Sequence, residues 1–167
     1  MSGVKTNSIT PVTVGYFLAP RLNAAGRMAD ASLSVDLLVE ENTSRARNLA
    51  LELDGLNRER QILQNNYLDK AIEALNSGDP EKAKVIIVEN DEWQSGLIGL
   101  VSGKLKEQFY RPALAFTRDI DGNFVGSARS IEAFHVTEAL TEFNHYFLNY
   151  GILVGKHMLV DTPQCEK

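Results

Sequence analysis

KVIIVENDEWQSGLIGLVSGKLKEQFYRPALAFT, residues 84–117, decides the fold of the second half of the chain. Residues 85–88 are β-branched and uncharged, which is typical of a buried strand. A polar loop follows, and the apolar pattern of residues 97–109 predicts a helix. Pro112 then opens a second strand over residues 113–117.

Two further elements continue this pattern. Asp121-Gly122 predicts a turn, and an extended run over residues 124–130 follows it. A helix is then expected to end near Phe143. The order strand, helix, strand, strand, helix predicts the fold class α/β, with a small mixed-sheet domain from about residue 82 onward.

The first half of the chain has a different residue pattern, which predicts mainly helices. Residues 12–18 are rich in β-branched and aromatic side chains and predict a short strand, and residues 30–40 predict a short helix. A long amphipathic stripe then predicts one helix over residues 41–78, about 50 Å in length at ~1.5 Å per residue. A rod of that length favours a spacer or a packing surface over a catalytic element.

Composition limits the classes of function. The chain has 167 residues and a net charge of −5, which argues against a generally basic nucleic-acid-binding surface but allows a local one. Residues 1–29 contain Lys5, Arg21 and Arg27 and no acid. The single cysteine, Cys165, excludes an intramolecular disulfide and a cysteine-based zinc site. Without a signal-peptide pattern or a membrane-spanning run, we expect a cytoplasmic protein with no membrane partner.

The first candidate site is PRLNAAGR, residues 20–27. Its small residues allow a partner to approach the backbone closely, and a loop that holds Arg21, Asn23 and Arg27 could grip an anion from several sides. The alternative is a tight packing turn between a strand and a helix.

The second candidate site is GSARS, residues 126–130. Gly126 leaves room for a ligand, Ser127 and Ser130 offer hydroxyls, and Arg129 can grip a phosphate or stack on a base. The alternative is a plain edge strand with a surface arginine. We expect substitution of Arg129 to weaken ligand binding with little loss of stability.

No catalytic centre is evident in the residue pattern. The histidines His135, His145 and His157 do not form a metal-binding arrangement, and the DxDG motif at residues 119–122 lacks the glutamate of a calcium loop and predicts a hairpin turn. P-loop and GxGxxG motifs are absent from the sequence. The chain is therefore expected to bind a phosphorylated ligand without a catalytic residue or metal ligand of its own.

Several motifs, in order and spacing, resemble the RecJ-type single-stranded-DNA-specific exonucleases of the DHH phosphoesterase superfamily. The resemblance extends from about residue 13 to residue 151. It rests on PRLNAAGR at residues 20–27, NRERQ at 57–61, WQSGLIGLV at 93–101, the Arg111-Pro112 pair and GSARS at 126–130.

The resemblance implies a two-lobed protein with a long connecting helix. Residues 1–40 would be the tail of a missing DHH lobe, 41–78 the connecting helix, and 79–167 the DHH-associated substrate-binding domain, truncated or divergent at its end. Two Mn²⁺ or Mg²⁺ ions would be bound by the missing lobe and none by this chain alone. Departures from the family are Gln94, where the family commonly has histidine, and Gly155-Lys156-His157, which is at best a displaced counterpart of a glycine- and histidine-containing motif.

The resemblance implies that the chain is part of a 5′→3′ single-stranded-DNA exonuclease, a hydrolase of DNA repair and recombination. Arg21, Asn23 and Arg27 would hold a phosphate near the metals. Ser127, Arg129 and Ser130 would grip the nucleotide, with Gly126 in the same site. Trp93 would stack on a base or pack in the core. The partners would be single-stranded DNA and the missing lobe, and this chain alone would be inactive. Alternatives are a DHH-type phosphodiesterase of small oligonucleotides or cyclic dinucleotides, and a non-catalytic nucleic-acid-binding module.

Overall fold

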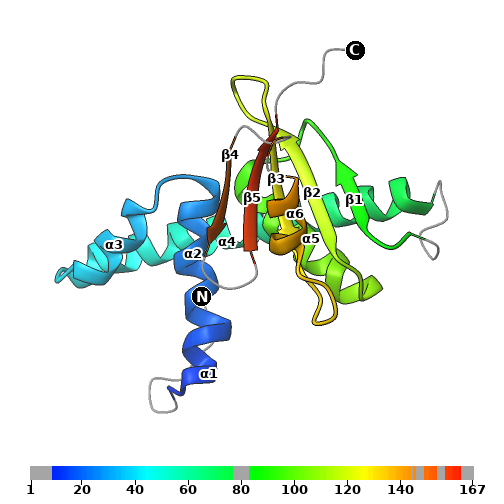
Figure 1. Cartoon of the computed structure of the whole chain (residues 1–167). Coiled ribbons are helices and arrows are strands. Elements are labelled where there is room, and N and C mark those ends of the chain that lie inside the picture. The colour runs from blue at the N-terminus through cyan, green and yellow to red at the C-terminus, as the bar shows by residue number, and fades with distance from the viewer. Residues whose placement is uncertain (1–8, 77–82, 144, 146–148, 154–156, 163–167) are drawn as a thin grey trace. The chain divides into compact units, whose positions relative to one another are not determined.

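The computed structural model describes residues 9–76, 83–143, 145, 149–153 and 157–162 (Figure 1). Gly155, Lys156 and the end of the chain after residue 162, on which parts of the predicted divergence fall, lie outside the described residues. The chain divides into two compact units, residues 1–63 and 64–167, and helix α4 (Thr43–Asn76) contributes to both.

The first unit is helical from its start. It contains α1 (Pro11–Thr13), a π-helical segment η2 (Val14–Leu18), α2 (Ala19–Met28), α3 (Ser32–Val39) and the first part of α4. The short strand predicted for residues 12–18 is wrong. The Thr10 hydroxyl accepts a hydrogen bond from the Thr13 amide, and Pro11 occupies the first helical turn, so a helix-start signal overrides the β-propensity of the residues that follow.

The PRLNAAGR segment is also helical rather than the loop predicted for it. Pro20 lies in the first turn of α2, where its missing N–H needs no partner. Ala24 and Ala25 favour helix and are fully buried, which lets α2 pack closely on its neighbours. The Ser34 hydroxyl of α3 donates to the Leu22 carbonyl at 2.6 Å, which fastens α3 to α2.

The helices predicted for residues 30–40 and 41–78 are confirmed as α3 and α4. The side chain of Asn42 caps the start of α4, because its Oδ1 accepts from the backbone amides of Ser44 and Arg45 at 3.0 and 3.1 Å. The helix is 34 residues long.

The second unit is a mixed sheet with helices on both of its faces, which confirms the predicted α/β fold class (Figure 1). The sheet has five strands in the order β1-β2-β3-β5-β4; β1 and β2 are parallel and the other pairs are antiparallel. The elements are β1 (Ile86–Glu89), α5 (Ser95–Phe109), β2 (Ala113–Arg118), β3 (Phe124–Arg129), α6 (Val136–Glu142), β4 (Asn149–Leu153) and β5 (His157–Thr162). Strands β4 and β5 were not predicted from the sequence.

Helices α5 and α6 lie on opposite faces of the sheet. Ala128 of β3 belongs to a buried cluster with Leu114 and with Val136 of α6, whereas the neighbouring Ser127 lies against Gly99 of α5. Successive side chains of a strand point to opposite faces, so α5 and α6 cover different sides. In Figure 1, α6 lies in front of the strands. The predicted turn before β3 is confirmed, and Gly122 adopts a positive φ of 83° there.

Gly126 is the position in β3 with no room for a side chain. A Cβ atom at this residue would lie 2.3 Å from Cε1 of Phe116, which packs across from it on β2. The requirement for glycine in the GSARS stretch is therefore a packing requirement within the sheet, not room for a ligand.

We predict that Gly126→Ala destabilises the chain by about 1–3 kcal/mol, because Phe116 must leave its place to admit the methyl group. Urea unfolding followed by circular dichroism measures the change. Gly103→Ala is the control: its methyl would meet Arg129 at an ordinary 3.6 Å, so the free energy of unfolding should hold or rise. Equal destabilisation by both substitutions would contradict the packing explanation.

Candidate functional site

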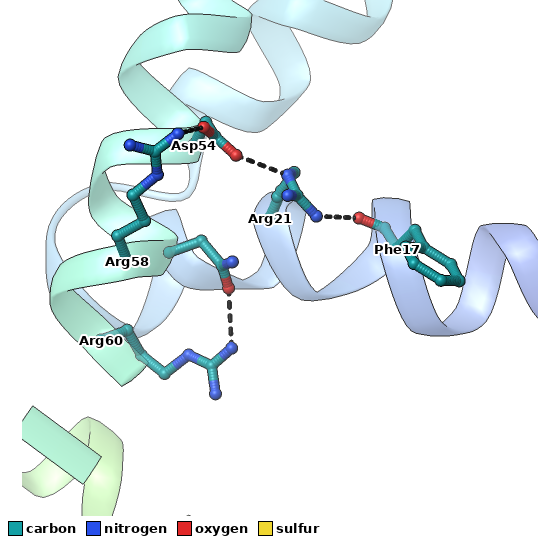
Figure 2. Close-up of polar contacts among 6 residues, drawn as sticks. Phe17, Arg21, Asp54, Arg58 and Arg60 are labelled. Carbon is teal, nitrogen blue, oxygen red and sulfur yellow. Dashed lines mark hydrogen bonds and ion pairs between the residues drawn. The ribbon is translucent and has the colours of Figure 1, made fainter. Parts of the chain in front are cut away.

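A group of four arginines from α2 and α4 forms the first candidate site; we call Arg21, Arg27, Arg58 and Arg60 the arginine cluster. Two of the four contact the carboxylate of Asp54 on α4, which is only 3% exposed. Arg21 Nε donates to Oδ1 of Asp54 and Arg58 Nη2 donates to Oδ2, both at 2.7 Å (Figure 2). Arg21 also donates to the Phe17 carbonyl. A buried carboxylate thus holds two guanidiniums in fixed positions.

The other two members of the cluster repel one another. Arg60 Nη2 donates to Oδ1 of the buried Asn57 at 2.7 Å. Arg27 of α2 is near enough for its charge to act on Arg60. Desolvation lowers the pKa of both guanidiniums, and the charge of Arg27 lowers the pKa of Arg60 further. Arg27 nevertheless stays exposed and Arg60 half-buried. A site with this electrostatic character favours an anion that both cations can reach.

The backbone that carries Arg21 and Arg27 is therefore helix α2 and not the predicted loop. They project from a helix, and Asn23 on the same helix is exposed. Sequence reasoning assigned no site role to Asp54, Arg58 or Arg60. Their signal was the i, i+4 spacing of Asp54 and Arg58 and the i, i+3 spacing of Asn57 and Arg60, which put each pair on one face of α4.

The GSARS residues lie in the second unit, and most of them are engaged in packing. Strand β3 lies between β2 and β5, so the edge-strand alternative is wrong. Ser127 is buried against α5, and the Ser130 hydroxyl accepts from the Val136 amide at 3.0 Å, at the start of α6. Arg129 donates through Nε and Nη2 to the Gly99 carbonyl at 3.1 and 2.6 Å. Substitution of Arg129 is now expected to lower stability as well as any binding.

Trp93 packs in the core. It is 4% exposed, and its ring stacks on Tyr67 with centroids 5.6 Å apart and planes 24° apart. Its carbonyl accepts from the Thr117 hydroxyl at 2.6 Å. The structure therefore favours the core alternative for Trp93 over base stacking.

The described residues do not form a metal centre. Among them, no three histidine, cysteine, aspartate or glutamate side chains come together in a way that could hold an ion. The family resemblance places the two divalent metals in the missing lobe, and the residues described here offer no set of ligands that fits them. In the described part of the chain, no helix is long and apolar enough to cross a membrane.

We predict unequal effects of the two arginines that share Asp54. The Arg21 side chain is 25% exposed and that of Arg58 is 70% exposed. Arg21→Gln should cost about 3 kcal/mol because it uncovers a buried charge, whereas Arg58→Gln should cost less than about 1 kcal/mol. Urea unfolding measures both, and equal costs would refute the assignment of Asp54 to a buried ion pair with Arg21.

The same ion pair predicts a pH dependence. The hydrogen bond from Arg21 is the main cause of the lowered pKa of Asp54. A lowered folded-state pKa means that the pair's stabilisation is present above the unfolded value of about 3.9 and is lost as pH falls through the folded value. The stability difference between wild type and Asp54→Asn should therefore shrink from about pH 5 downward in urea unfolding. A difference that grows on acidification would contradict this sign.

The comparisons with known proteins agree on one family. No family model matches the chain. The RecJ single-stranded-DNA-specific exonuclease of Haemophilus influenzae is 36% identical over 153 residues, which are 90% of this chain and 27% of that protein. The RecJ of Bacillus subtilis is 38% identical over 152 residues, 90% of this chain and 19% of that protein.

Solved structures give the same result. RecJ from Thermus thermophilus in complex with Mg²⁺ superposes with a TM-score of 0.80 at 31% identity, over 92% of this chain and 23% of that one. An exonuclease RecJ bound to manganese gives 0.75 at 30% identity, over 92% and 37%. The chain spans about a quarter of the length of the relatives it matches. This chain is RecJ-like, and over about nine tenths of its length it corresponds to a partial region of the RecJ proteins of the DHH superfamily.

Proposed function

We propose that this chain is the strand-binding part of a RecJ-like 5′→3′ single-stranded-DNA exonuclease that acts in DNA repair and recombination in the cytoplasm. The observation that carries the proposal is the arginine cluster, in which Asp54 holds Arg21 and Arg58 while Arg60 bonds to the neighbouring Asn57 and senses the charge of Arg27. Its electrostatic character suits a phosphate of the DNA strand, because guanidiniums bind phosphate oxygens in pairs of hydrogen bonds.

Within this cluster the residues have different tasks. Asp54 holds Arg21 in place, so Arg21 meets the strand without first losing side-chain freedom. Arg27 and Arg60 carry like charges that repel each other, and a bound phosphate would reduce this repulsion. The exposed amide of Asn23 adds a neutral hydrogen-bonding group.

In the second unit, Arg129 is the member of the GSARS stretch proposed to contact the nucleotide. Ser127 lies beside it against Gly99 of α5, whereas Gly126, Ser130 and Trp93 are given supporting roles in packing. Both units would thus offer arginines to the strand, from α2 and α4 in one and from β3 in the other.

Hydrolysis itself is assigned to the part of the longer protein that this chain does not span. The RecJ structures that resemble the chain contain Mg²⁺ or Mn²⁺, and the described residues here do not gather ligands for such ions. The metal ligands would come from the DHH lobe, while residues 79–167 would act as the DHH-associated lobe.

The surface of the first unit supports a large partner of this kind. Apolar side chains that are 45–78% exposed cover α1, η2 and α3; they are Val12, Val14, Tyr16, Phe17, Val35, Leu38 and Val39. Between α2, α3 and α4 lies an apolar cavity of about 230 Å³. An exposed apolar surface of this extent is typical of an interface, and we propose that the DHH lobe of the same protein packs on it. No observation favours the phosphodiesterase or the non-catalytic alternative.

We predict that the purified chain binds a 5′-phosphorylated twelve-nucleotide oligo-dT at low salt and does not cleave it when Mn²⁺ is added. Arg27→Gln should weaken binding about tenfold, because one phosphate contact is lost. For the same reason, the slope of log K against log salt concentration should fall in magnitude by about one. Fluorescence anisotropy at several salt concentrations measures both quantities.

The matched control is Arg47→Gln, which removes the same charge from an exposed position of α4 outside the cluster. It should change the affinity less than about twofold. Equal losses of affinity for the two variants would mean that binding depends only on overall charge and not on the arginine cluster. Mn²⁺-dependent cleavage by the pure chain would contradict the assignment of hydrolysis to the DHH lobe.

A further inference from the structure

The last turn of α5 leads into a tyrosine with an unusual backbone conformation. Tyr110 has φ 48° and ψ 47°, and in the described part of the chain it is the one non-glycine residue with a positive φ. This left-handed conformation is common where a helix ends, but the residue that adopts it is usually glycine, because a side chain there crowds the backbone. A bulky ring at this position therefore carries a backbone strain that glycine would avoid.

Packing does not explain the ring. Tyr110 is 67% exposed, and within the described residues its side chain makes no hydrogen bond, ion pair or ring contact. Tyr67, by contrast, is 7% exposed and stacks on Trp93. A large side chain that is held in a strained backbone conformation without a packing role points to a function outside the fold.

The neighbours of Tyr110 are charged rather than apolar. Lys106 lies one helical turn earlier, Arg111 follows directly, and the carboxylate of Glu107 is paired with Lys104 at 3.0 Å. An aromatic ring among such residues does not belong to a contiguous apolar patch of the kind that binds another protein. It suits a nucleobase of a single strand, because the base can stack on the ring while the cations attract the sugar–phosphate backbone.

Tyr110 also lies near the end of the sheet at which β3 ends. Strand β2 begins three residues later at Ala113, and Ala113 pairs with Arg129 at the last position of β3. At most about 11 Å of chain separates Tyr110 from Ala113. The ring is therefore close to the strand end where a nucleotide is proposed to bind.

We propose that Tyr110 is a stacking platform for a base of the single strand. The inference rests on the proposed function for the identity of the strand. It adds a contact to a base, whereas the arginines are proposed to contact the strand through its phosphates. Because every base has a π face, the platform would accept any sequence.

The test removes the ring without removing a charge. Tyr110→Gly should keep or raise the free energy of unfolding in urea, because glycine adopts the left-handed conformation without strain. The same variant should bind 5′-phosphorylated oligo-dT about five- to tenfold more weakly, because the stacking of one base is lost. The slope of log K against log salt concentration should stay that of the wild type, because no phosphate contact is lost. Tyr110→Phe, which keeps the ring, should retain the affinity.

Three controls separate stacking from other causes. An abasic strand of the same length has the phosphates without the bases, so Tyr110→Gly and the wild type should bind it equally. Ile120→Ala removes a fully exposed apolar side chain from the turn between β2 and β3, and it should change the affinity for oligo-dT less than about twofold. Tyr110→Asn is a second variant without the ring, and it should behave as Tyr110→Gly does, since asparagine also tolerates the left-handed conformation.

The possible failures of the inference and of the proposed function can be told apart. If the two variants without the ring bind oligo-dT as the wild type does, lose the same affinity for the abasic strand, or unfold more easily, Tyr110 is not a stacking platform and the proposed function stands. If the wild type does not bind oligo-dT, the proposed function fails and the inference fails with it.

Discussion

The first unit depends on one buried charge, the carboxylate of Asp54. An ionised group removed from water is tolerated only when other groups satisfy it, and the guanidiniums of Arg21 and Arg58 do so here. Because Arg21 also bonds to the Phe17 carbonyl, one side chain connects η2, α2 and α4. The arrangement that would hold a phosphate is thus the same arrangement that holds three helical segments together.

In the second unit, a residue proposed to bind also holds the fold together. Arg129 is fastened to a carbonyl of α5 and also lies at the wall of a groove. Ser127 and Ala128 of the same strand pack on opposite faces of the sheet, and the absence of a side chain at Gly126 leaves room for the Phe116 ring. Residue types that suggested a binding motif therefore have packing reasons of their own, and only Arg129 among them also faces the groove.

The elements of the second unit from β1 to α6 were predictable because their signals are local, whereas β4 and β5 were not predicted. The β-branched run before β1, the apolar periodicity of α5 and the Asp121-Gly122 turn each report on a few neighbouring residues. The error at residues 12–18 arose where two local signals conflict, since β-branched side chains follow a helix cap at Thr10 and a proline at the first turn. The Asp54 network was not predictable, because the pairing of Arg21 with Asp54 depends on how α2 packs on α4. Trp93 could have been a binding or a core residue until Tyr67 was placed beside it.

The hydrogen bond from the Val136 amide to the Ser130 hydroxyl has a consequence for how this molecule can be observed. Ser130 directly follows Arg129 in the chain, and the Val136 amide is the first of α6. An amide proton held by a side chain exchanges with solvent when that side chain moves, so its exchange rate reports on the end of β3. The Val136 amide, on the face of the sheet opposite α5, can therefore report movement of β3 by its exchange rate, without contacting a ligand.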